Sequence, residues 1–283
     1  MHHVVALLLH YRDAELSIRC IRSLLAEPVK RVVVWDNSAD DGVSVAAVRA
    51  AFPHEPRLDI QPSAENLGFA AGANRGLAHC RSVAPEAWVL LINNDACLLP
   101  GALTVLLGAL ESHAQALLAC PDIDHGGRVQ GLSYCHRWTG LLSSRPLPGY
   151  FAYASGCCLL LALDRLEMPL FDEDFFMYGE DCELGWRLAH RDGALLHVGR
   201  TLVEHQGAAS SGLGSPFYEA HMVAAHLILA RKLAQGRVDA LLLYLLRGSM
   251  LLARACVRSI RFRSLVPWRA LRQGLRIMRG RRR

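Results

Sequence analysis

The sequence predicts an α/β fold with a doubly wound, mostly parallel sheet and flanking helices, followed by a C-terminal amphipathic helical extension. Short apolar runs alternate with helical patterns from Val4 to Cys120, and such repeated βα units favour parallel strands. Turn residues, such as Asp40-Asp41-Gly42, separate these segments. The chain has 283 residues, of which 52% are hydrophobic, so it can bury a sizeable core and is not expected to be disordered.

The elements follow one another along the chain with clear boundaries. We expect strands at 4–9, 32–35, 58–61, 88–92 and 117–120, and helices at 14–25, 43–51, 68–79 and 102–113. Asp13 is the expected N-cap of the first helix. Residues 124–148 indicate loops or short hairpins, and we then expect a strand at 156–163, a helix at 180–191, short strands at 195–198 and 202–204, and a Gly/Ser-rich loop at 206–216. We predict a catalytic domain over 1–215 and a helical, basic segment over 216–283.

The nine cysteines favour a reducing compartment, because several lie inside apolar runs and none forms paired zinc-type CxxC motifs. The N-terminus enters an apolar run without a basic region or a cleavage site, which indicates a first strand and a cytoplasmic protein. No uncharged apolar stretch reaches the 18 residues of a membrane span, since Arg247 ends the run 240–246.

The run 88–95 ends in Asn93, Asn94 and Asp95. The C-terminal end of a buried parallel strand is where an open α/β sheet places its ligand. A carboxylate there suits a hard divalent cation that shares phosphate oxygens, although ordinary turn chemistry explains the same pattern. Asp36 follows the second predicted strand, where it either forms an Asx turn or contacts a nucleotide. No G-x-G-x-x-G follows the first strand, so a Rossmann dinucleotide site is not expected.

The segment 66–76 begins with Asn66 and carries Gly68, Gly72 and Gly76 at every fourth position. Glycine costs a helix about 1 kcal/mol relative to alanine, so this face indicates a close approach of ligand or backbone. Tight packing of helix on sheet is the alternative. Arg75 either offers a planar fork to a phosphate or is a solvated side chain.

Glu180 and Asp181 follow the aromatic run 175–178 and begin a predicted helix. The helix dipole favours acids there, and Glu183 and Arg187 are spaced for an ordinary i,i+4 pair. The apolar neighbours also raise the proton affinity of a carboxylate toward that of a working base. His205 ends a strand before the Gly/Ser loop, where a neutral imidazole would complete a metal site begun by Asp95, and the loop 206–214 would close over the ligand.

These five clusters, in this order and spacing over residues 4–212, resemble glycosyltransferase family 2 and its rhamnosyltransferase-like branch. The resemblance implies a GT-A fold, a nucleotide-sugar donor and a Mg²⁺ or Mn²⁺ ion at the donor diphosphate. It also implies a role for each matching residue. Asp36 would contact the nucleobase. The donor-binding loop would include Asn66, Gly68 and Arg75. Asn93-Asn94-Asp95 corresponds to the D-x-D motif, Asp95 and His205 would bind the metal, and Asp181 would be the general base with Glu180 beside it.

The sequence departs from the family pattern at two places. Asn93 replaces the first acid of the D-x-D motif, which weakens the expected metal affinity. The first strand leads into His10-Tyr11-Arg12, where relatives often have Asn or Thr near the Tyr, so the base pocket is expected to differ.

The implied activity is an inverting, metal-dependent transfer of a sugar to a hydroxyl of a lipid-linked or other glycan acceptor in bacterial cell-surface polysaccharide synthesis. The expected donor is dTDP-rhamnose or a UDP-sugar. A catalytically impaired nucleotide-sugar-binding membrane scaffold is the alternative, which Asn93 favours. A nucleotidyltransferase would need a Gly-rich, basic phosphate loop after the first strand, and residues 10–17 contain none.

Charge is strongly segregated along the chain. Residues 237–283 carry 13 Arg and one acid, a net charge of +12, whereas the whole chain has +5, so residues 1–236 carry −7. The spacing of the arginines predicts helix stripes that contact anionic headgroups on the inner face of the cell membrane. The stripes comprise Arg247, Arg254, Arg258 and Arg261, and then Arg269, Arg272, Arg276 and Arg279. A solvated helix face is the alternative, and no nucleic-acid partner is expected because the body is acidic.

Overall fold

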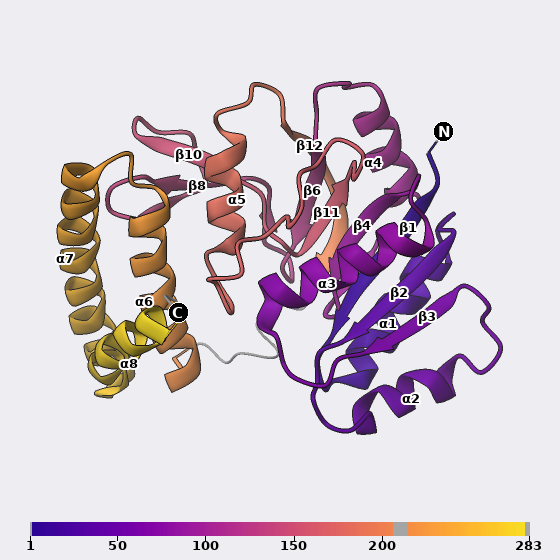
Figure 1. Cartoon of the computed structure of the whole chain (residues 1–283), viewed down its shortest axis with the longest axis horizontal. Coiled ribbons are helices and arrows are strands. Elements are labelled where there is room, and N and C mark those ends of the chain that lie inside the picture. The colour runs from indigo at the N-terminus through magenta and orange to yellow at the C-terminus, as the bar shows by residue number, and fades with distance from the viewer. Residues whose placement is uncertain (1, 206–213, 281–283) are drawn as a thin grey trace.

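The computed structural model describes residues 2–205 and 214–280. Within them, the main sheet has nine strands in the order β3-β2-β1-β4-β11-β6-β12-β5, with β7 paired to β6 (Figure 1). The strands are β1 (Val4–His10), β2 (Arg31–Asp36), β3 (Leu58–Pro62), β4 (Trp88–Asn93), β5 (Ala96–Leu98), β6 (Leu118–Asp124), β7 (Val129–Gln130), β11 (Cys158–Leu161) and β12 (Leu195–His205). A small second sheet contains β8 (Ser133–His136), β9 (Leu142–Ser143) and β10 (Tyr150–Tyr153).

Helices cover both faces of the main sheet, as predicted for a doubly wound fold. The helices of the described residues are α1 (Ala14–Leu25), α2 (Val43–Ala51), α3 (Gly68–Val83), α4 (Ala102–Glu111), α5 (Glu180–Leu188), α6 (Pro216–Lys232), α7 (Arg237–Phe262) and α8 (Val266–Gly280). The side chain of Asp13 accepts a hydrogen bond from the Leu16 backbone at 3.1 Å, which confirms the predicted N-cap of α1.

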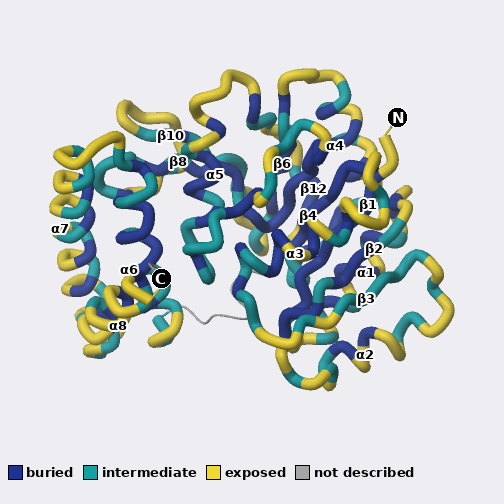
Figure 2. The backbone as a smooth tube through the Cα atoms, viewed as in Figure 1, coloured by how far each residue is buried: buried dark blue, intermediate teal, exposed yellow. Residues whose placement is uncertain are grey.

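The central strand β1 is buried on both faces, so its successive side chains enter two different hydrophobic clusters. Val5 and Leu7 belong to the cluster under α3, whereas Ala6 and Leu8 belong to the cluster under α1 and α4. Figure 2 shows the resulting buried layer through the middle of the sheet. The alternation explains why an unbroken apolar run forms this strand.

The sheet is mixed and mostly parallel, as predicted, with β11 antiparallel between β4 and β6. Other expectations need correction. One irregular strand, β12, replaces the two predicted short strands. Bulges between Val198 and Val203 account for the break in the apolar pattern. The short strands β5 and β10 were not predicted, and residues 206–213 of the predicted Gly/Ser loop lie outside the described residues.

The C-terminal helices stack at one end of the molecule (Figure 1). Buried residues of α6 share the hydrophobic cluster that contains Val5 and Leu7, so α6 joins the extension to the core. The boundary at residue 215 stays a prediction. By length and composition alone, α7 is a candidate membrane span, which the sequence expectation missed because Arg247 interrupts the apolar run.

The predicted orientation of the α7 arginine stripe is wrong. Arg247 is fully buried and donates a hydrogen bond to the Arg137 carbonyl at 2.8 Å. Arg254 and Arg258 bind the buried carboxylate of Glu219 on α6. Three of the four arginines therefore face the protein, two of them because the buried acid of α6 requires positive partners, whereas Arg261 is exposed.

Candidate active site

The parallel strands β1, β2 and β4 end at the same edge of the sheet. In the strand register His10 lies opposite Asp36, and Leu9 lies opposite Asn93. The polar residues predicted after these strands therefore meet at the edge where an α/β sheet places its ligand crevice.

Asp36 is buried at this edge, and its Oδ1 accepts a hydrogen bond from the Ser38 backbone at 3.0 Å. The Asx-turn interpretation is thus confirmed, and the nucleobase contact stays a prediction. Beside it, His10 shares hydrogen bonds with the hydroxyls of Ser17 at 2.7 Å and Ser44 at 3.0 Å. Burial lowers the pKa of His10 and so favours the neutral imidazole, although the negative charge of Asp36 acts in the opposite direction.

The start of α3 is fixed by two asparagines. Asn66 Oδ1 accepts hydrogen bonds from the Gly68 backbone at 2.9 Å and from Asn37 Nδ2 at 3.2 Å. Asn37 also donates to the Gly68 carbonyl at 2.9 Å. Gly68 has a φ of +78°, and an added Cβ would lie 2.2 Å from the Phe176 carbonyl oxygen. Only glycine fits this loop. The role of Asn37 was not predicted from the sequence.

The other two glycines of α3 face the sheet. An added Cβ at Gly72 would lie 3.3 Å from Leu9, and one at Gly76 would lie 2.6 Å from Leu7. Close packing of helix on sheet, the alternative interpretation of the glycine spacing, is therefore confirmed for these two positions. Arg75 lies on the exposed side of α3, and its phosphate contact stays a prediction.

The turn after β4 is tied to its neighbours on both sides. The Asn93 N–H donates to the Cys157 carbonyl at 2.9 Å, and Asn94 Nδ2 donates to Ser17 Oγ at 3.2 Å. The same hydroxyl contacts His10, so the turn and the corner at Asp36 share one hydrogen-bonded path. This path holds the backbone that presents Asp95.

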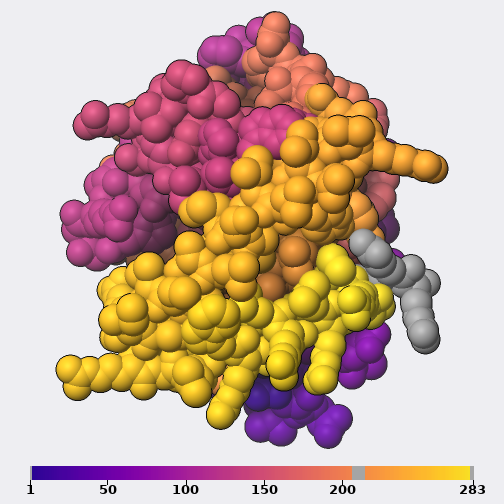
Figure 3. All heavy atoms as spheres, turned by 90° about the vertical axis from the view of Figure 1, so that its left-hand side faces the viewer, coloured from indigo at the N-terminus to yellow at the C-terminus, as the bar shows by residue number. Residues whose placement is uncertain are grey.

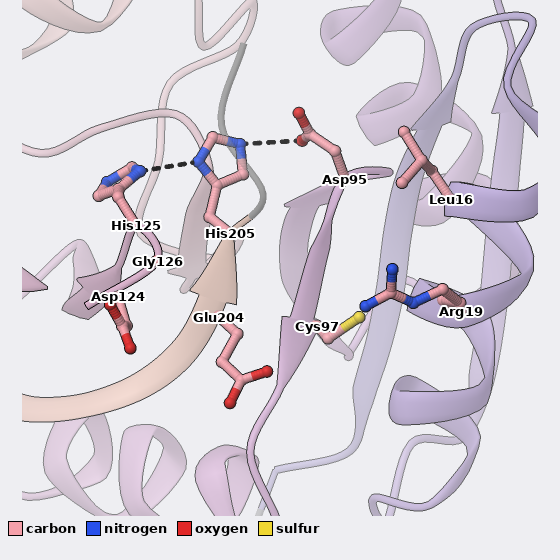
Figure 4. Close-up of a pocket in the computed structure, with 9 residues that line it drawn as sticks. All are labelled: Leu16, Arg19, Asp95, Cys97, Asp124, His125, Gly126, Glu204 and His205. Atoms are coloured by element: carbon pink, nitrogen blue, oxygen red, sulfur yellow. Dashed lines mark hydrogen bonds and ion pairs between the residues drawn. The ribbon is translucent and has the colours of Figure 1, made fainter. Parts of the chain in front are cut away.

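Asp95 Oδ1 lies 2.9 Å from His205 Nε2, and both side chains are about nine-tenths buried. His205 Nδ1 lies 3.0 Å from Nδ1 of His125 (Figure 4). The parallel register of β6 and β12 pairs Asp124 with Glu204 and so brings the residues that follow them together. Burial, and then the neighbouring His205, lower the pKa of His125. His125 was not predicted from the sequence, although it follows a strand end like the other candidates.

A cavity of about 570 Å³ borders this cluster. Its lining residues, shown in Figure 4, are Leu16, Arg19, Asp95, Cys97, Asp124, His125, Gly126, Glu204 and His205. Asp36, Asn66 and Asp181 do not line it.

The donor set of Asp95 and His205 fits a metal that also binds other ligands. In the part of the chain that the structure describes, no group of three or more His, Cys, Asp or Glu side chains could hold a metal by itself. One carboxylate and one imidazole suit Mg²⁺ or Mn²⁺ when substrate phosphates and water complete the coordination.

Glu180 and Asp181 occupy the first turn of α5, after Gly179 with a φ of +92°. Burial raises the pKa of both acids, and the charge of Asp181 raises that of Glu180 further. Glu180 Oε2 is buried and has no hydrogen-bond partner among the described residues, whereas Asp181 is only partly buried and accepts from the Cys182 backbone at 2.7 Å. Glu183 and Arg187 form the predicted i,i+4 pair at 2.9 Å.

Backbone contacts connect α5 with the strand edge. A hydrogen bond from the Gly156 backbone lowers the pKa of Asp181, partly offsetting burial, and Gly156 precedes Cys157, which accepts from Asn93. On the other side, the Phe69 N–H donates to the Phe176 carbonyl at 2.7 Å. The partly buried acid is thus held between the end of β4 and the start of α3.

Comparison with known proteins identifies relatives over most of the chain. The family model described as glycosyl transferase family 2 matches residues 10–161, which is more than half of the chain. An N-acetylglucosaminyl-diphospho-decaprenol L-rhamnosyltransferase of Mycobacterium tuberculosis is 29% identical over 284 residues, covering 86% of this chain and 90% of the relative.

Solved structures resemble the fold at low sequence identity. GalNAc-T7 with UDP, GalNAc and Mn²⁺ has a TM-score of 0.61 and 14% identity over 80% of this chain, which spans 47% of that protein. A mannosyltransferase from Pyrobaculum calidifontis in complex with GDP-Man and Mn²⁺ has a TM-score of 0.57 and 14% identity, over 98% of this chain and 74% of that protein. At this identity the likeness concerns the fold alone.

Proposed function

The chain belongs to glycosyltransferase family 2, with the GT-A fold and a rhamnosyltransferase-like sequence, and we propose that it transfers rhamnose from a nucleotide donor to a lipid-linked glycan acceptor. The proposed sugar and acceptor are based on the relative of 29% identity, which is named as an N-acetylglucosaminyl-diphospho-decaprenol L-rhamnosyltransferase. dTDP-rhamnose is the first candidate donor, and a UDP-sugar is the second. The contact between Asp95 and His205, at an edge rich in polar side chains, is the observation that supports donor binding there.

Asp181 is the proposed general base. Its carboxylate takes the proton of the acceptor hydroxyl while that oxygen attacks the anomeric carbon from the face opposite the leaving nucleoside diphosphate. The configuration inverts in one displacement, without a covalent enzyme intermediate. The raised pKa of Asp181 and its partial exposure support this role, because a stronger base that the acceptor can reach removes a proton more readily. Glu180 lies deeper and would keep the site apolar when protonated.

Asp95 and His205 are the proposed metal-binding residues, and His125 would orient the His205 ring through its Nδ1 contact. A bound Mg²⁺ or Mn²⁺ ion would supply positive charge against the departing diphosphate. Mn²⁺ accompanies the nucleotide or nucleotide-sugar in both structural neighbours, which supports a divalent cofactor. Asn93 offers only a neutral oxygen where relatives often carry an acid, so we expect weaker metal binding than in a two-acid motif.

Asp36, Asn66 and Gly68 are the proposed donor contacts, with the exposed Arg75 at the periphery. The rigid hydrogen bonds around Asn37 and Ser17 would hold these groups in place before the donor arrives, so little order is lost on binding. The predicted closing loop 206–214 falls mostly outside the described residues.

We further propose that the protein works at the cytoplasmic face of a bacterial cell membrane, where a lipid-linked acceptor would be found. Asn93 also favours a second candidate, a nucleotide-sugar-binding scaffold with impaired catalysis. A panel of nucleotide sugars, assayed for nucleoside diphosphate release with a lipid-linked N-acetylglucosamine acceptor, separates the two. We expect acceptor-dependent release from dTDP-rhamnose that stops when the divalent ion is chelated. Donor binding without release from any donor would favour the scaffold, and pyrophosphate release would instead indicate nucleotidyl transfer.

A further inference from the structure

The outer face of α7 is apolar and exposed. Nine of the nineteen large apolar residues that are exposed in the described part of the chain lie on this one helix. They are Val238, Leu241, Leu242, Leu245, Leu246, Leu252, Val257, Ile260 and Phe262. Soluble proteins seldom present so long a contiguous apolar surface to water, so this face is expected to bind a partner.

The inner face of α7 is fixed against the protein. Leu243, Leu251 and Ala255 are buried there, and two arginines reach Glu219, with hydrogen bonds of 2.5 Å from Arg254 and 2.6 Å from Arg258. These contacts set the rotation of the helix. The apolar residues face outward because Arg247, Arg254 and Arg258 are held inward.

The next helix adds positive charge to the same side of the molecule. Figure 3 shows α7 and α8 side by side on one continuous face. Four arginines of α8 are exposed: Arg269, Arg272, Arg276 and Arg279. The sequence contains no acidic residue from 240 to 283, so no carboxylate there opposes an anionic partner.

We propose that this face docks on a bilayer that contains anionic phospholipids, with α7 lying in the plane of the interface, its leucines among the acyl chains and the α8 arginines at the lipid phosphates. This pairing of an apolar helix face with adjacent cationic residues is the one that interfacial helices use. The inference deepens the proposed membrane location, because it reverses which side of α7 meets the lipid.

The observations favour a bilayer over two other occupants. A second copy placed on this face would bring two arginine-rich α8 helices together, with the charge repulsion that this entails. A transmembrane α7 would carry Arg254 and Arg258 into hydrocarbon and leave the Glu219 carboxylate, which is fully buried, without them.

In the docked orientation, a lipid-linked acceptor would also lie close to the proposed donor-binding loop. A cavity of about 580 Å³ is lined by Phe176 and Phe217 together with Ile277 of α8. Phe176 in turn contacts the start of α3 through its carbonyl. A substrate held near α8 would thus lie next to the loop that we assign to the donor.

Vesicle flotation tests the proposal with the full chain. We expect the protein to float with vesicles of phosphatidylglycerol and phosphatidylcholine and not with phosphatidylcholine alone. Leu241→Gln with Leu245→Gln should weaken partitioning at least tenfold per leucine, and Arg272→Gln with Arg276→Gln about fivefold per arginine. Val43→Gln is the control, since Val43 is an apolar residue that is even more exposed and begins α2, at the other end of the molecule (Figure 1). It should float like the wild type.

Four results would overturn the proposal. These are equal flotation of the leucine variants and the wild type, equal binding to neutral vesicles, resistance of the bound protein to extraction at alkaline pH, and a dimer in lipid-free solution that the leucine changes dissociate. Resistance to alkaline extraction would indicate that α7 spans the membrane, and such a dimer would indicate that this face binds a second copy of the chain. Nucleoside diphosphate release with a soluble acceptor analogue should be unchanged in the leucine variants, so a failure of docking is distinguishable from a failure of the proposed activity.

Discussion

The carboxylate of Asp95 and the imidazole of His205 lie 2.9 Å apart, although 110 residues separate them in the sequence. Asp95 lies between β4 and β5, and β5 pairs antiparallel with β12, so that His205 lies opposite Ala96, the residue after Asp95. The pair is the most direct link between the fold and the proposed chemistry, since it joins a carboxylate and an imidazole beside a cavity.

Metal affinity tests this pair. Asp95→Asn and His205→Ala should each weaken Mn²⁺ binding by about tenfold or more in the presence of nucleoside diphosphate, measured by titration calorimetry. Glu204→Gln is the control, because this carboxylate lines the same cavity but points away from the pair (Figure 4). If Glu204→Gln weakens Mn²⁺ binding as much as Asp95→Asn does, the effect comes from the total negative charge of the cavity and not from coordination by Asp95 and His205.

The donor loop should be intolerant of a side chain at Gly68. Gly68→Ala places a Cβ 2.2 Å from a backbone oxygen at a positive φ, so we expect a loss of more than about 1 kcal/mol of stability together with weaker donor binding. Gly108→Ala, in α4, meets nothing within 4 Å and should be neutral or slightly stabilising. Thermal unfolding and donor titration measure both. An alanine tolerated at Gly68 without either loss would contradict the account of this loop.

The buried acid Glu180 should make stability depend on pH. Burial raises its pKa in the folded state, so its contribution is fully present below the unfolded pKa and is lost as the pH rises through the folded pKa. Glu180→Gln removes the titration, and its melting temperature should rise relative to the wild type as the pH increases above the usual range of glutamate. Glu167→Gln, at an exposed surface pair, is the control. A constant difference across pH would count against burial as the cause.

The contact between α6 and α7 should depend on Glu219. Glu219→Gln leaves Arg254 and Arg258 without their carboxylate, and we expect a loss of about 3 kcal/mol in the free energy of unfolding. Glu55→Gln removes a carboxylate from a partly exposed surface pair with Arg57 and should cost much less than Glu219→Gln. Denaturant unfolding compares the two. Equal small losses would show that the arginines do not depend on the buried acid.

The sequence predicted the α/β class, the cap at Asp13 and the clustering of polar residues at strand ends, because parallel strands and helix caps follow local rules. It did not predict the antiparallel insertion of β11, since strand direction depends on the tertiary path. His125 and Asn37 were missed for a related reason. Their roles come from neighbours that only the folded chain brings near, namely His205 and the start of α3.

The orientation of the α7 arginines also could not be predicted from the sequence. Their spacing correctly indicated one helix stripe, but periodicity does not say which side faces the protein. That choice is made by Glu219 on α6, which lies 35 residues before Arg254 in the sequence.

The central claim is that this glycosyltransferase uses Asp181 to deprotonate the acceptor, and a comparison of Asp181→Asn with the wild type tests it most directly. The measurement is rhamnosyl transfer to a lipid-linked N-acetylglucosamine acceptor at saturating dTDP-rhamnose, with donor affinity determined in parallel. We predict that transfer falls by at least about a hundredfold while donor affinity stays within about twofold, because the base acts on the acceptor alone. Retained turnover in the variant would contradict the account.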